Sequence, residues 1–466
     1  MVNKSSRVPA NRMSRLGGLA SLASRVAGGM LAEGARQLAQ GKRPDTKTML
    51  LTPANVRRLA DQLAHMRGAA MKLGQLLSMD AGDLMPAELA QLLAKLRANA
   101  NPMPAKQLAQ VLRQELGEQW QQHFADFTFA PMAAASIGQL HQAYHDNGSK
   151  LAVKVQYPGI KASIDSDVDN VATLLKLTGL IPDGVAYQRL LSEAKRQLKN
   201  EADYLQEAHY LQRYRQYLAA DDAYVVPQVL PQLSTSNILV MTYVTGEPIE
   251  VLQQAPQAER DRVISLMFSL FFRELFEFKL VQTDPNFANY LYNQQTAQLV
   301  LLDFGACRDY SNDISQSYQL LFTSACVNDR AGIERALTQI GFFSEHILAE
   351  QKQAVLNLVE LACEPVKHNL AYDFATSDLA LRLREAGTEL SLKKNYWHSP
   401  PADALFLHRK IAGLYLLAAR LGAKVNVRAL LLPFLALQQG PPAAKQQLEP
   451  QLLQDNIKPQ PQDRYE

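Results

Sequence analysis

Two aspartates and an asparagine, at fixed spacing around a short apolar run, constrain this chain most strongly. Asp284 lies in the segment QTDPNFAN, Asn289 follows it by five positions, and Asp303 opens an Asp-Phe-Gly triplet 14 positions later. The run LVLLD before the triplet favours a strand that ends at the aspartate. A lone Asp-Phe-Gly turn often arises by chance, whereas the complete arrangement is specific.

These residue types suit phosphoryl transfer from a nucleotide. In kinase-type enzymes an aspartate placed like Asp284 faces the nucleophile, and an asparagine placed like Asn289 holds Mg²⁺. The aspartate of the triplet, here Asp303, bridges the metal to the phosphates. Hard oxygen ligands suit an ion that phosphate already coordinates. The sequence therefore predicts Asp284 as a catalytic residue, Asn289 and Asp303 as metal ligands, and ATP with Mg²⁺ as the bound species.

A lysine in an apolar strand offers a phosphate contact. Lys154 lies within LAVKV, where its ammonium costs free energy unless it is paired or reaches an edge. In kinase folds such a lysine binds phosphates and pairs with a helix glutamate. One long helix, predicted at about 186–219, offers Glu193, Glu201 and Glu207. A solvent-facing lysine is the alternative, and the Asp-Phe-Gly triplet favours the phosphate role.

The segment before that strand departs from an ordinary nucleotide loop. In AAASIGQ (133–139) alanines stand where a glycine-rich loop would cover the phosphates. Alanine restricts the backbone, so nucleotide binding should differ from that of an ordinary kinase. The strand NILVMTYV leads to Gly246, where a hinge would contact adenine, and ordinary core packing of this strand is equally compatible. The nucleotide-binding candidates are Ala133, Ala134, Ala135, Ser136, Lys154, Met241 and Val244.

Changes in composition and hydrophobic pattern along the chain divide its 466 residues into zones. Strand-like and helix-like patterns segregate, which predicts an α+β fold of protein-kinase type with a small β-rich N-lobe and a helical C-lobe. The expected zones are a basic glycine-rich extension (1–50), a helical domain (51–125), the N-lobe (126–245), the C-lobe (246–437) and a disordered Gln/Pro-rich tail (438–466).

Composition and charge exclude several classes of protein. A hydrophobic content of 47% excludes overall disorder, and a net charge of +3 is too small for a nucleic-acid binder that works through bulk charge. Three cysteines build no disulfide framework and have no metal-ligand spacing, which indicates a reducing compartment. No uncharged apolar run reaches the roughly 18–20 residues that span a bilayer. Residues 1–32 carry five basic and no acidic residues, which suits either an anionic membrane interface or a helix packed on the catalytic domain.

Three further segments resemble a known family. MKLGQLLS (71–78) contains the signature K-x-G-Q, NEADYLQEA (200–208) contains E-x-D, and VKVQYPGI (153–160) is also typical. With the motifs above, they resemble the UbiB family of atypical protein-kinase-like ATPases over about 16–437. The resemblance is closest to the subgroup that serves coenzyme Q (ubiquinone) biosynthesis.

This resemblance implies a gate over the site. The K-x-G-Q segment would form an added helical domain that blocks the groove for a protein substrate, and Glu207 falls where the family places its helix glutamate. No Ala-Pro-Glu triplet occurs in 303–335, and Gln282 and Thr283 replace the usual His-Arg pair before the catalytic aspartate. These departures disfavour protein phosphorylation in trans. The residues implied to gate the site are Lys72, Gln75, Glu201 and Asp203.

We therefore expect a MgATP-binding, kinase-like ATPase that supports ubiquinone biosynthesis at a membrane surface, with Asp284, Lys154 and Glu207 as candidate catalytic residues. One alternative is a small-molecule or lipid kinase, and another is a nucleotide-switched scaffold for a biosynthetic complex. Candidate partners are anionic membrane lipids, quinone precursors, ubiquinone-biosynthesis proteins and a second copy of the chain, without nucleic acid. The expected location is cytoplasmic and peripheral at the inner membrane, with the mitochondrial matrix as the alternative.

Overall fold

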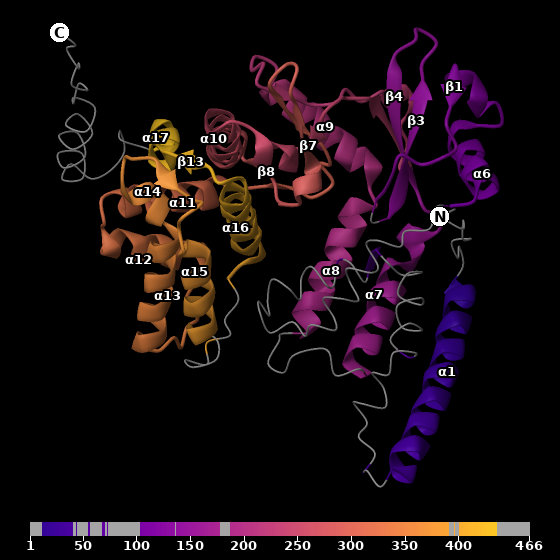
Figure 1. The fold of residues 1–466 in the computed structure, drawn as a ribbon, viewed down its shortest axis with the longest axis horizontal. Helices are drawn as coiled ribbons and strands as arrows, with labels where there is room; N and C mark the ends of the chain where they lie inside the picture. Colours follow the sequence, from indigo (N-terminus) through magenta and orange to yellow (C-terminus); the bar gives the residue numbers. More distant parts are fainter. Residues whose placement is uncertain are drawn as a thin grey trace. The chain divides into compact units, whose positions relative to one another are not determined.

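A computed structural model describes the chain in two compact units (Figure 1). The residues described are 12–40, 43, 55, 68–69, 72, 103–135, 137–177, 187–390, 396 and 400–435. Unit 1 comprises Met1–Ala220, Val225–Thr245 and Leu302–Ala306, and unit 2 comprises Asp221–Tyr224, Gly246–Leu301 and Cys307–Glu466. The Asp-Phe-Gly triplet thus belongs to unit 1, although the sequence placed it within the 246–437 zone. The expected disordered tail at 438–466 lies outside the described residues.

Unit 1 combines an antiparallel sheet with helices. Its elements are α1 (Arg12–Ala39), α6 (Ala105–Leu116), η2 (Trp120–His123), β1 (Asp126–Phe127), β2 (Ala133–Ala134), β3 (Gly138–Tyr144), β4 (Lys150–Gln156), α7 (Ile160–Leu177), α8 (Tyr187–Glu201), α9 (Tyr204–Tyr217), η3 (Pro231–Leu233) and β6 (Ile238–Thr242).

The sheet of unit 1 has the order β1-β3-β4-β6, with β2 paired to β3. Strand β4 is central, and six of its seven residues are buried because both of its faces are covered. In the register of the sheet, Lys154 lies opposite Leu140 of β3 and Leu239 of β6. The apolar run that the sequence offered as a strand is therefore an inner strand, and its lysine enters the interior.

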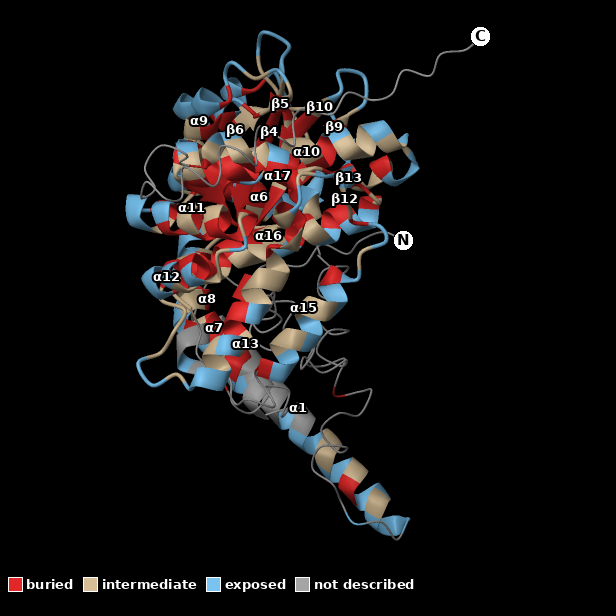
Figure 2. Ribbon diagram, turned by 90° about the vertical axis from the view of Figure 1, so that its left-hand side faces the viewer, coloured by how far each residue is buried: buried red, intermediate tan, exposed pale blue. Residues whose placement is uncertain are grey.

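Helix α6 belongs to the core of this sheet. Leu108 and Leu112, one turn apart on α6, join Val153 and Val155 of β4 in one cluster of buried side chains. Buried residues, drawn in red in Figure 2, occur both in the strands and on the helix faces that pack around them. A boundary at residue 125 would divide this cluster, so α6 packs with the sheet rather than in a separate core.

The helical pattern at 186–219 forms two helices, and the single long helix predicted from it is wrong. Helix α8 ends at Glu201, and α9 begins at Tyr204. Asp203 is the N-cap of α9, where its side chain accepts a 3.2 Å hydrogen bond from the backbone N–H of Gln206. Such a cap satisfies a backbone donor that the new helix would otherwise leave unpaired.

Unit 2 is mostly helical. Its elements are β5 (Tyr224–Val225, shared with unit 1), β7 (Glu247–Pro248), η4 (Ile249–Gln254), α10 (Gln257–Arg273), η5 (Glu274–Phe278), β8 (Leu280–Gln282), η6 (Phe287–Asn289), β9 (Tyr290–Asn293), β10 (Gln298–Leu301), β11 (Cys307–Asp309), α11 (Asn312–Cys326), α12 (Arg330–Ile340), α13 (Ala349–Ala362), α14 (Glu364–Lys367), β12 (Tyr372–Asp373), α15 (Leu379–Thr388), α16 (Ala402–Leu421), β13 (Lys424–Val425), α17 (Val427–Leu431) and η8 (Leu432–Phe434).

Short strands in unit 2 frame one loop. Strand β8 pairs with β11, and β9 pairs with β10, all antiparallel. The loop 283–286 and η6 therefore run between β8 and β9, so both ends of the QTDPNFAN segment are fixed by strand pairing. Helix α16 ends where Gly422 adopts a left-handed backbone with φ of 62°, a conformation that glycine reaches without steric cost.

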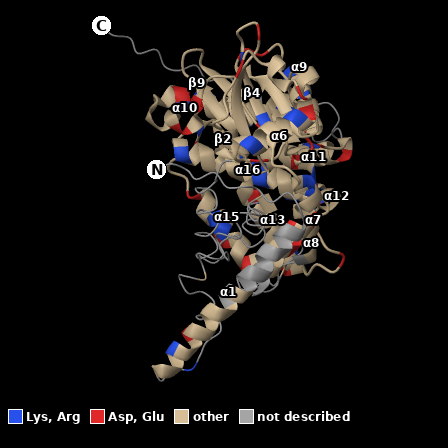
Figure 3. Ribbon diagram, turned by 90° about the vertical axis from the view of Figure 1, so that its right-hand side faces the viewer, with Lys and Arg blue, Asp and Glu red and all other residues tan. Residues whose placement is uncertain are grey.

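Helix α1 differs from the rest of unit 1 in its exposure. Its described side chains are exposed or intermediate except at Gly34. The charged side chains described along it are Glu33 and Arg36, which form an ion pair one turn apart. Figure 3 marks basic residues in blue and acidic residues in red along the ribbon. Among the described residues, no helix has the length and apolar character that crossing a membrane requires.

Candidate functional site

A buried lysine and glutamate form the centre of the site in unit 1. Lys154 Nζ on β4 lies 2.8 Å from both Oε1 and Oε2 of Glu207 in the first turn of α9. The side chains are 11% and 2% exposed. Of the three glutamates that the sequence offered, Glu207 is the partner, whereas Glu193 accepts from Arg196 and Gln197. The solvent-facing alternative for Lys154 is wrong, because the ammonium is enclosed and paired.

Asp303 lies beside this pair in the same unit. Its Oδ1 is 3.8 Å from Lys154 Nζ and accepts a 3.1 Å hydrogen bond from the backbone N–H of Gly305. The backbone of Asp303 is left-handed with φ of 52°, a strained conformation for a residue other than glycine. Phe304 is buried against Tyr214 of α9, with ring centroids 4.7 Å apart. The turn is thus anchored by Phe304 and presents a carboxylate that is 47% exposed.

Electrostatics keep Lys154 charged. Burial alone would lower the pKa of its ammonium, but the charges of Asp303 and Glu207 outweigh burial and raise that pKa. Burial raises the pKa of Glu207 to about 7, against the opposing effect of Lys154. The site therefore holds a permanent cation next to a half-exposed carboxylate, an arrangement suited to a polyanionic ligand.

The alanine segment forms the edge of the same sheet. Ala133 and Ala134 make up β2, are exposed, and lie opposite Leu140 and Gln139 of β3. The backbone N–H of Ala135 donates to the carbonyl of Gly138 at 2.9 Å. Ser136 lies outside the described residues.

Gly138 ends the alanine segment where no larger residue fits. A Cβ at this position would lie 2.5 Å from the carbonyl oxygen of Val155 and 2.7 Å from the hydroxyl of Tyr204. The hinge candidates lie farther along the sheet. Met241 is in β6, Val244 follows β6, and both are half-buried.

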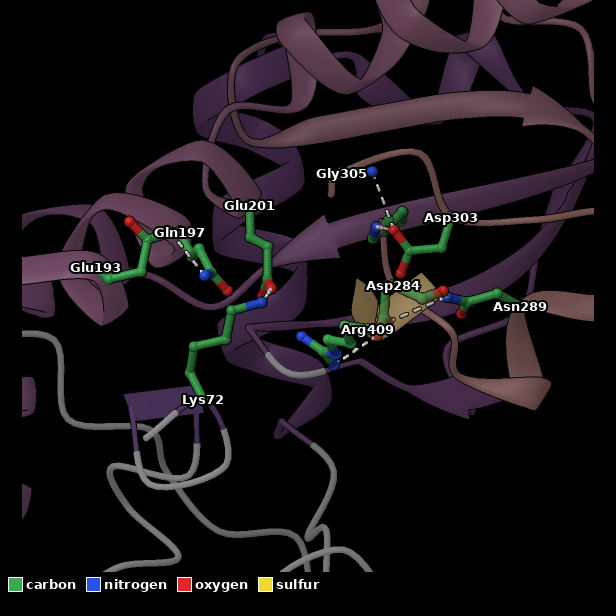
Figure 4. A network of polar contacts seen from close by, with 10 residues as sticks. Lys72, Glu193, Gln197, Glu201, Asp284, Asn289, Asp303, Gly305 and Arg409 are labelled. Carbon is green, nitrogen blue, oxygen red and sulfur yellow. Dashed lines mark hydrogen bonds and ion pairs between the residues drawn. The ribbon is translucent and has the colours of Figure 1, made fainter. Parts of the chain in front are cut away.

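The implied gate is described in part. Lys72 is buried and forms an ion pair with Glu201 at the end of α8 (Figure 4). Asp203, two residues on, caps α9. Gln75 lies outside the described residues. Unit 1 therefore brings together Lys72 and Glu201, as the family resemblance implied, and gives Asp203 a local structural contact.

Asp284 and Asn289 form a second cluster, in unit 2. The Asn289 side-chain amide donates to Asp284 Oδ2 at 3.1 Å. The other oxygen of Asp284, Oδ1, accepts from Arg409 Nη2 at 3.0 Å (Figure 4). Because the amide nitrogen of Asn289 is engaged by Asp284, its carbonyl oxygen is the atom left for other partners.

Helix α16 contributes residues that sequence reasoning missed. Lys410 Nζ donates to Tyr290 Oη at 2.8 Å and to Gln282 Oε1 at 3.1 Å, and lies 3.6 Å from Glu274 Oε2. The neighbouring His408 makes a structural contact, since its Nε2 lies 3.0 Å from the hydroxyl of Tyr318. The basic pair Arg409-Lys410 within an apolar helix was the available signal.

Each unit offers an oxygen ligand of the type that Mg²⁺ accepts. In unit 1 it is the carboxylate of Asp303, and in unit 2 it is the side-chain carbonyl of Asn289. Among the described residues, no group of three or more His, Cys, Asp or Glu side chains is placed to hold a metal by itself.

Comparison with known proteins gives a consistent family. The ABC1 atypical kinase-like domain matches residues 95–337. The protein "Atypical kinase COQ8, mitochondrial" from Saccharomyces cerevisiae is 38% identical over 423 residues, covering 91% of this chain and 84% of that protein. The protein of the same name from Schizosaccharomyces pombe is 35% identical over 434 residues, covering 92% and 70%.

A solved structure extends the likeness to the fold. The Rv3197–erythromycin complex from Mycobacterium tuberculosis has a TM-score of 0.56 at 22% identity, and covers 82% of this chain and 94% of that chain. At this identity the likeness concerns the fold alone. The predicted kinase-like fold and the family resemblance drawn from the motifs are both confirmed. The chain belongs to the ABC1 atypical kinase-like family.

Proposed function

We propose that this chain is a kinase-like ATPase that uses MgATP and supports ubiquinone biosynthesis. The observation that carries the proposal is the group in unit 1 formed by Lys154, Glu207 and Asp303. A buried cation held by one carboxylate, next to a second carboxylate that is half-exposed, matches the needs of a phosphate chain with its metal. The link to ubiquinone follows from the family and from relatives named for COQ8.

Each residue has a defined task in this proposal. Lys154 provides positive charge toward the phosphates, and Glu207 fixes the direction of the ammonium through two 2.8 Å contacts. Asp284 orients the nucleophile, which we take to be water. Asn289 and Asp303 would hold Mg²⁺, which neutralises charge that develops on the phosphates.

Protein phosphorylation in trans is not part of the proposal. After Gly305 the chain enters β11 at once and begins α11 at Asn312. Strand β11 is paired with β8, which supports the view that the described residues 303–335 do not form a peptide-docking segment. The Lys72–Glu201 ion pair joins the K-x-G-Q segment to α8, which supports a gate that excludes a protein substrate.

We also propose a peripheral membrane location, either at a bacterial inner membrane or in the mitochondrial matrix. The yeast relatives are named mitochondrial. The five basic residues among 1–32 would favour an anionic lipid surface. Quinone precursors and biosynthetic proteins are the partners that this location would provide.

The decisive experiment measures phosphate and ADP release by the purified chain, with and without anionic liposomes. Asp303→Asn should abolish both the turnover and the thermal stabilisation by MgATP, while the fold persists. Asp146→Asn, in the exposed turn between β3 and β4, is the matched control and should behave as the parent.

Other outcomes identify the alternatives. A phosphorylated small molecule or lipid in place of free phosphate would establish a small-molecule kinase. Nucleotide binding without any turnover would establish a switched scaffold. Full stabilisation of Asp303→Asn by MgATP would show that this aspartate does not bind the metal.

A further inference from the structure

The loop that carries Asp284 has no cation of its own. In the segment Gln282–Asn289 every other side chain is uncharged. The preceding basic residue, Lys279, instead donates a hydrogen bond from its ammonium group to the side-chain oxygen of Asn312. The positive charge that faces Asp284 therefore comes from elsewhere in unit 2.

That charge comes from α16, 125 positions along the chain. Arg409 Nη2 donates to Asp284 Oδ1 at 3.0 Å, and the two side chains are 14% and 20% exposed. Because Asn289 donates to Oδ2 of the same carboxylate, Asp284 is held from both sides. A largely buried guanidinium–carboxylate contact is directional, so it restricts rotation of the carboxylate as well as neutralising its charge.

The helix contacts the loop at two further places. Lys410 bonds to Gln282 and Tyr290, which flank the loop at its two ends. Gly413, one turn after Arg409, lies directly against Pro285, since a Cβ at this glycine would be 2.2 Å from the Pro285 Cβ. Hence α16 approaches the loop so closely that only glycine is tolerated at the contact.

We infer that Arg409 is the positioning residue of the Asp284 loop, and that it acts on this loop from α16. By fixing the Asp284 carboxylate, Arg409 also fixes the amide of Asn289 and the direction of its carbonyl oxygen. This inference rests on the proposed function for its kinetic consequence. Its structural consequence can be measured without nucleotide.

The structural test is hydrogen–deuterium exchange of the nucleotide-free chain over 283–291. In the parent, the backbone N–H groups of Ala288 and Asn289 are hydrogen-bonded to Asn286. Arg409→Ala should accelerate exchange in this segment, and added guanidinium chloride should slow it again. Sodium chloride at equal ionic strength should not. Arg409→Lys keeps a positive charge but loses the planar guanidinium group, so its segment 283–291 should exchange at an intermediate rate. This variant replaces Arg409→Ala in the test if the alanine variant is insoluble.

The kinetic test compares kcat with KM for MgATP. Since a displacement of about 1 Å can cost about 10²-fold in rate, Arg409→Ala should lower kcat about 100-fold. Its KM for MgATP should rise much less than kcat falls, because Lys154 and Asp303 are unchanged in this variant. Guanidinium should restore part of kcat in a saturable manner.

The matched control is Arg330→Ala. Arg330 bonds to Glu360, Gln353 and Asn357, which all lie on α13. It should leave loop exchange and kcat unchanged. Parental exchange over 283–291 in Arg409→Ala would overturn the inference, as would equal losses in the control. If the parent showed no ATP turnover, the proposed function would be refuted. The hydrogen–deuterium exchange over 283–291 would then decide by itself whether Arg409 positions the loop.

Discussion

Both units contain a buried lysine beside a glutamate, and the surroundings of the two pairs differ. In unit 1, Lys154 contacts both oxygens of Glu207 at 2.8 Å, and the half-exposed Asp303 lies next to it. In unit 2, the side chains of Lys410 and Glu274 are 3% and 1% exposed, and lie 3.6 Å apart. The ammonium of Lys410 makes its shorter contacts with the neutral groups of Gln282 and Tyr290.

The difference indicates that the pair in unit 1 can contact a ligand, whereas the pair in unit 2 stabilises the fold. The charge of Glu274 raises the pKa of Lys410 against the opposite effect of burial, so both lysines stay charged. Only the pair in unit 1 borders a group that solvent reaches. Lys410 instead joins α16 to β8, β9 and η5, which surround the Asp284 loop. We therefore expect substitutions at the two lysines to differ in kind: loss of function at one and loss of stability at the other.

The largest effect should come from Lys410→Met. The variant breaks the buried ion pair between Lys410 and Glu274, and removing one partner of such a pair typically costs about 3–5 kcal/mol. Urea unfolding followed by circular dichroism measures the loss. The double variant Lys410→Met/Glu274→Leu removes both charges and should recover most of it, because apolar replacement of a buried pair is often neutral. A single variant as stable as the parent would show that Lys410 does not support the fold.

Lys154→Met should affect turnover more than stability. Loss of a positioned charge at the phosphates lowers kcat by about 10²–10³-fold. The stability loss should be smaller than for Lys410, because the pKa of Glu207 is raised to about 7 and this carboxyl can take up a proton when its partner is removed. The matched control is Lys150→Met on the same strand, where the ammonium lies over the Tyr243 ring. If Lys154→Met hydrolysed ATP as fast as the parent, a role for Lys154 at the phosphates would be contradicted.

The pair in unit 1 was largely predictable from sequence, whereas the pair in unit 2 was not. A lysine within LAVKV implies a buried partner, and the helix after it supplied Glu207 as one of three candidates. Lys410 and Arg409 contact residues that lie more than a hundred positions earlier. No local pattern encodes such contacts, because they depend on how α16 packs on the loop. Only the unusual basic pair in an apolar helix pointed to them.

The break between α8 and α9 could have been found. Asp203 followed three residues later by Gln206 is a capping pattern of the type that starts helices. Leucines that continue at helical spacing across 186–219 concealed the break, since both helices bury a face. Helical periodicity therefore showed that the segment is helical, and only the capping residue showed where one helix ends.

The next prediction concerns pH, and it tests whether the part of α16 around His408 is enclosed by other side chains. Burial lowers the pKa of His408 to about 4, and its neighbours are the Tyr318 hydroxyl and the Phe342 ring. The unfolded chain binds this proton near pH 6.5, whereas the folded chain does not. Stability present above pH 6.5 is therefore lost as pH falls toward 4, by about 2 kcal/mol between pH 7 and pH 5.

The comparison of the parent with His408→Gln isolates this contribution. Glutamine can still bond to Tyr318 but does not titrate, so the difference in unfolding free energy between the two proteins should change by about 2 kcal/mol from pH 7 to pH 5. Urea unfolding at both pH values measures it. A constant difference would show that His408 titrates in the folded chain, and that this part of α16 is open to protons.

The smallest effect should come from Ala134→Gly, at the exposed edge of the unit 1 sheet. Ala134 pairs with Gln139 of β3, two strands from Lys154. Glycine reaches backbone conformations that alanine avoids, so β2 should loosen at a cost of about 0.5–1 kcal/mol. If β2 covers the phosphates, the ratio of ATP to ADP affinity should change by less than about tenfold, since 1.4 kcal/mol corresponds to tenfold. The matched control is Ala412→Gly, an exposed position on α16, which should cost about 1 kcal/mol without altering that ratio. Calorimetric titration with both nucleotides decides between them. If Ala134→Gly left the ratio of ATP to ADP affinity unchanged, β2 would not shape the nucleotide site. Asp303 would then be the solvent-exposed group of unit 1 that contacts the ligand.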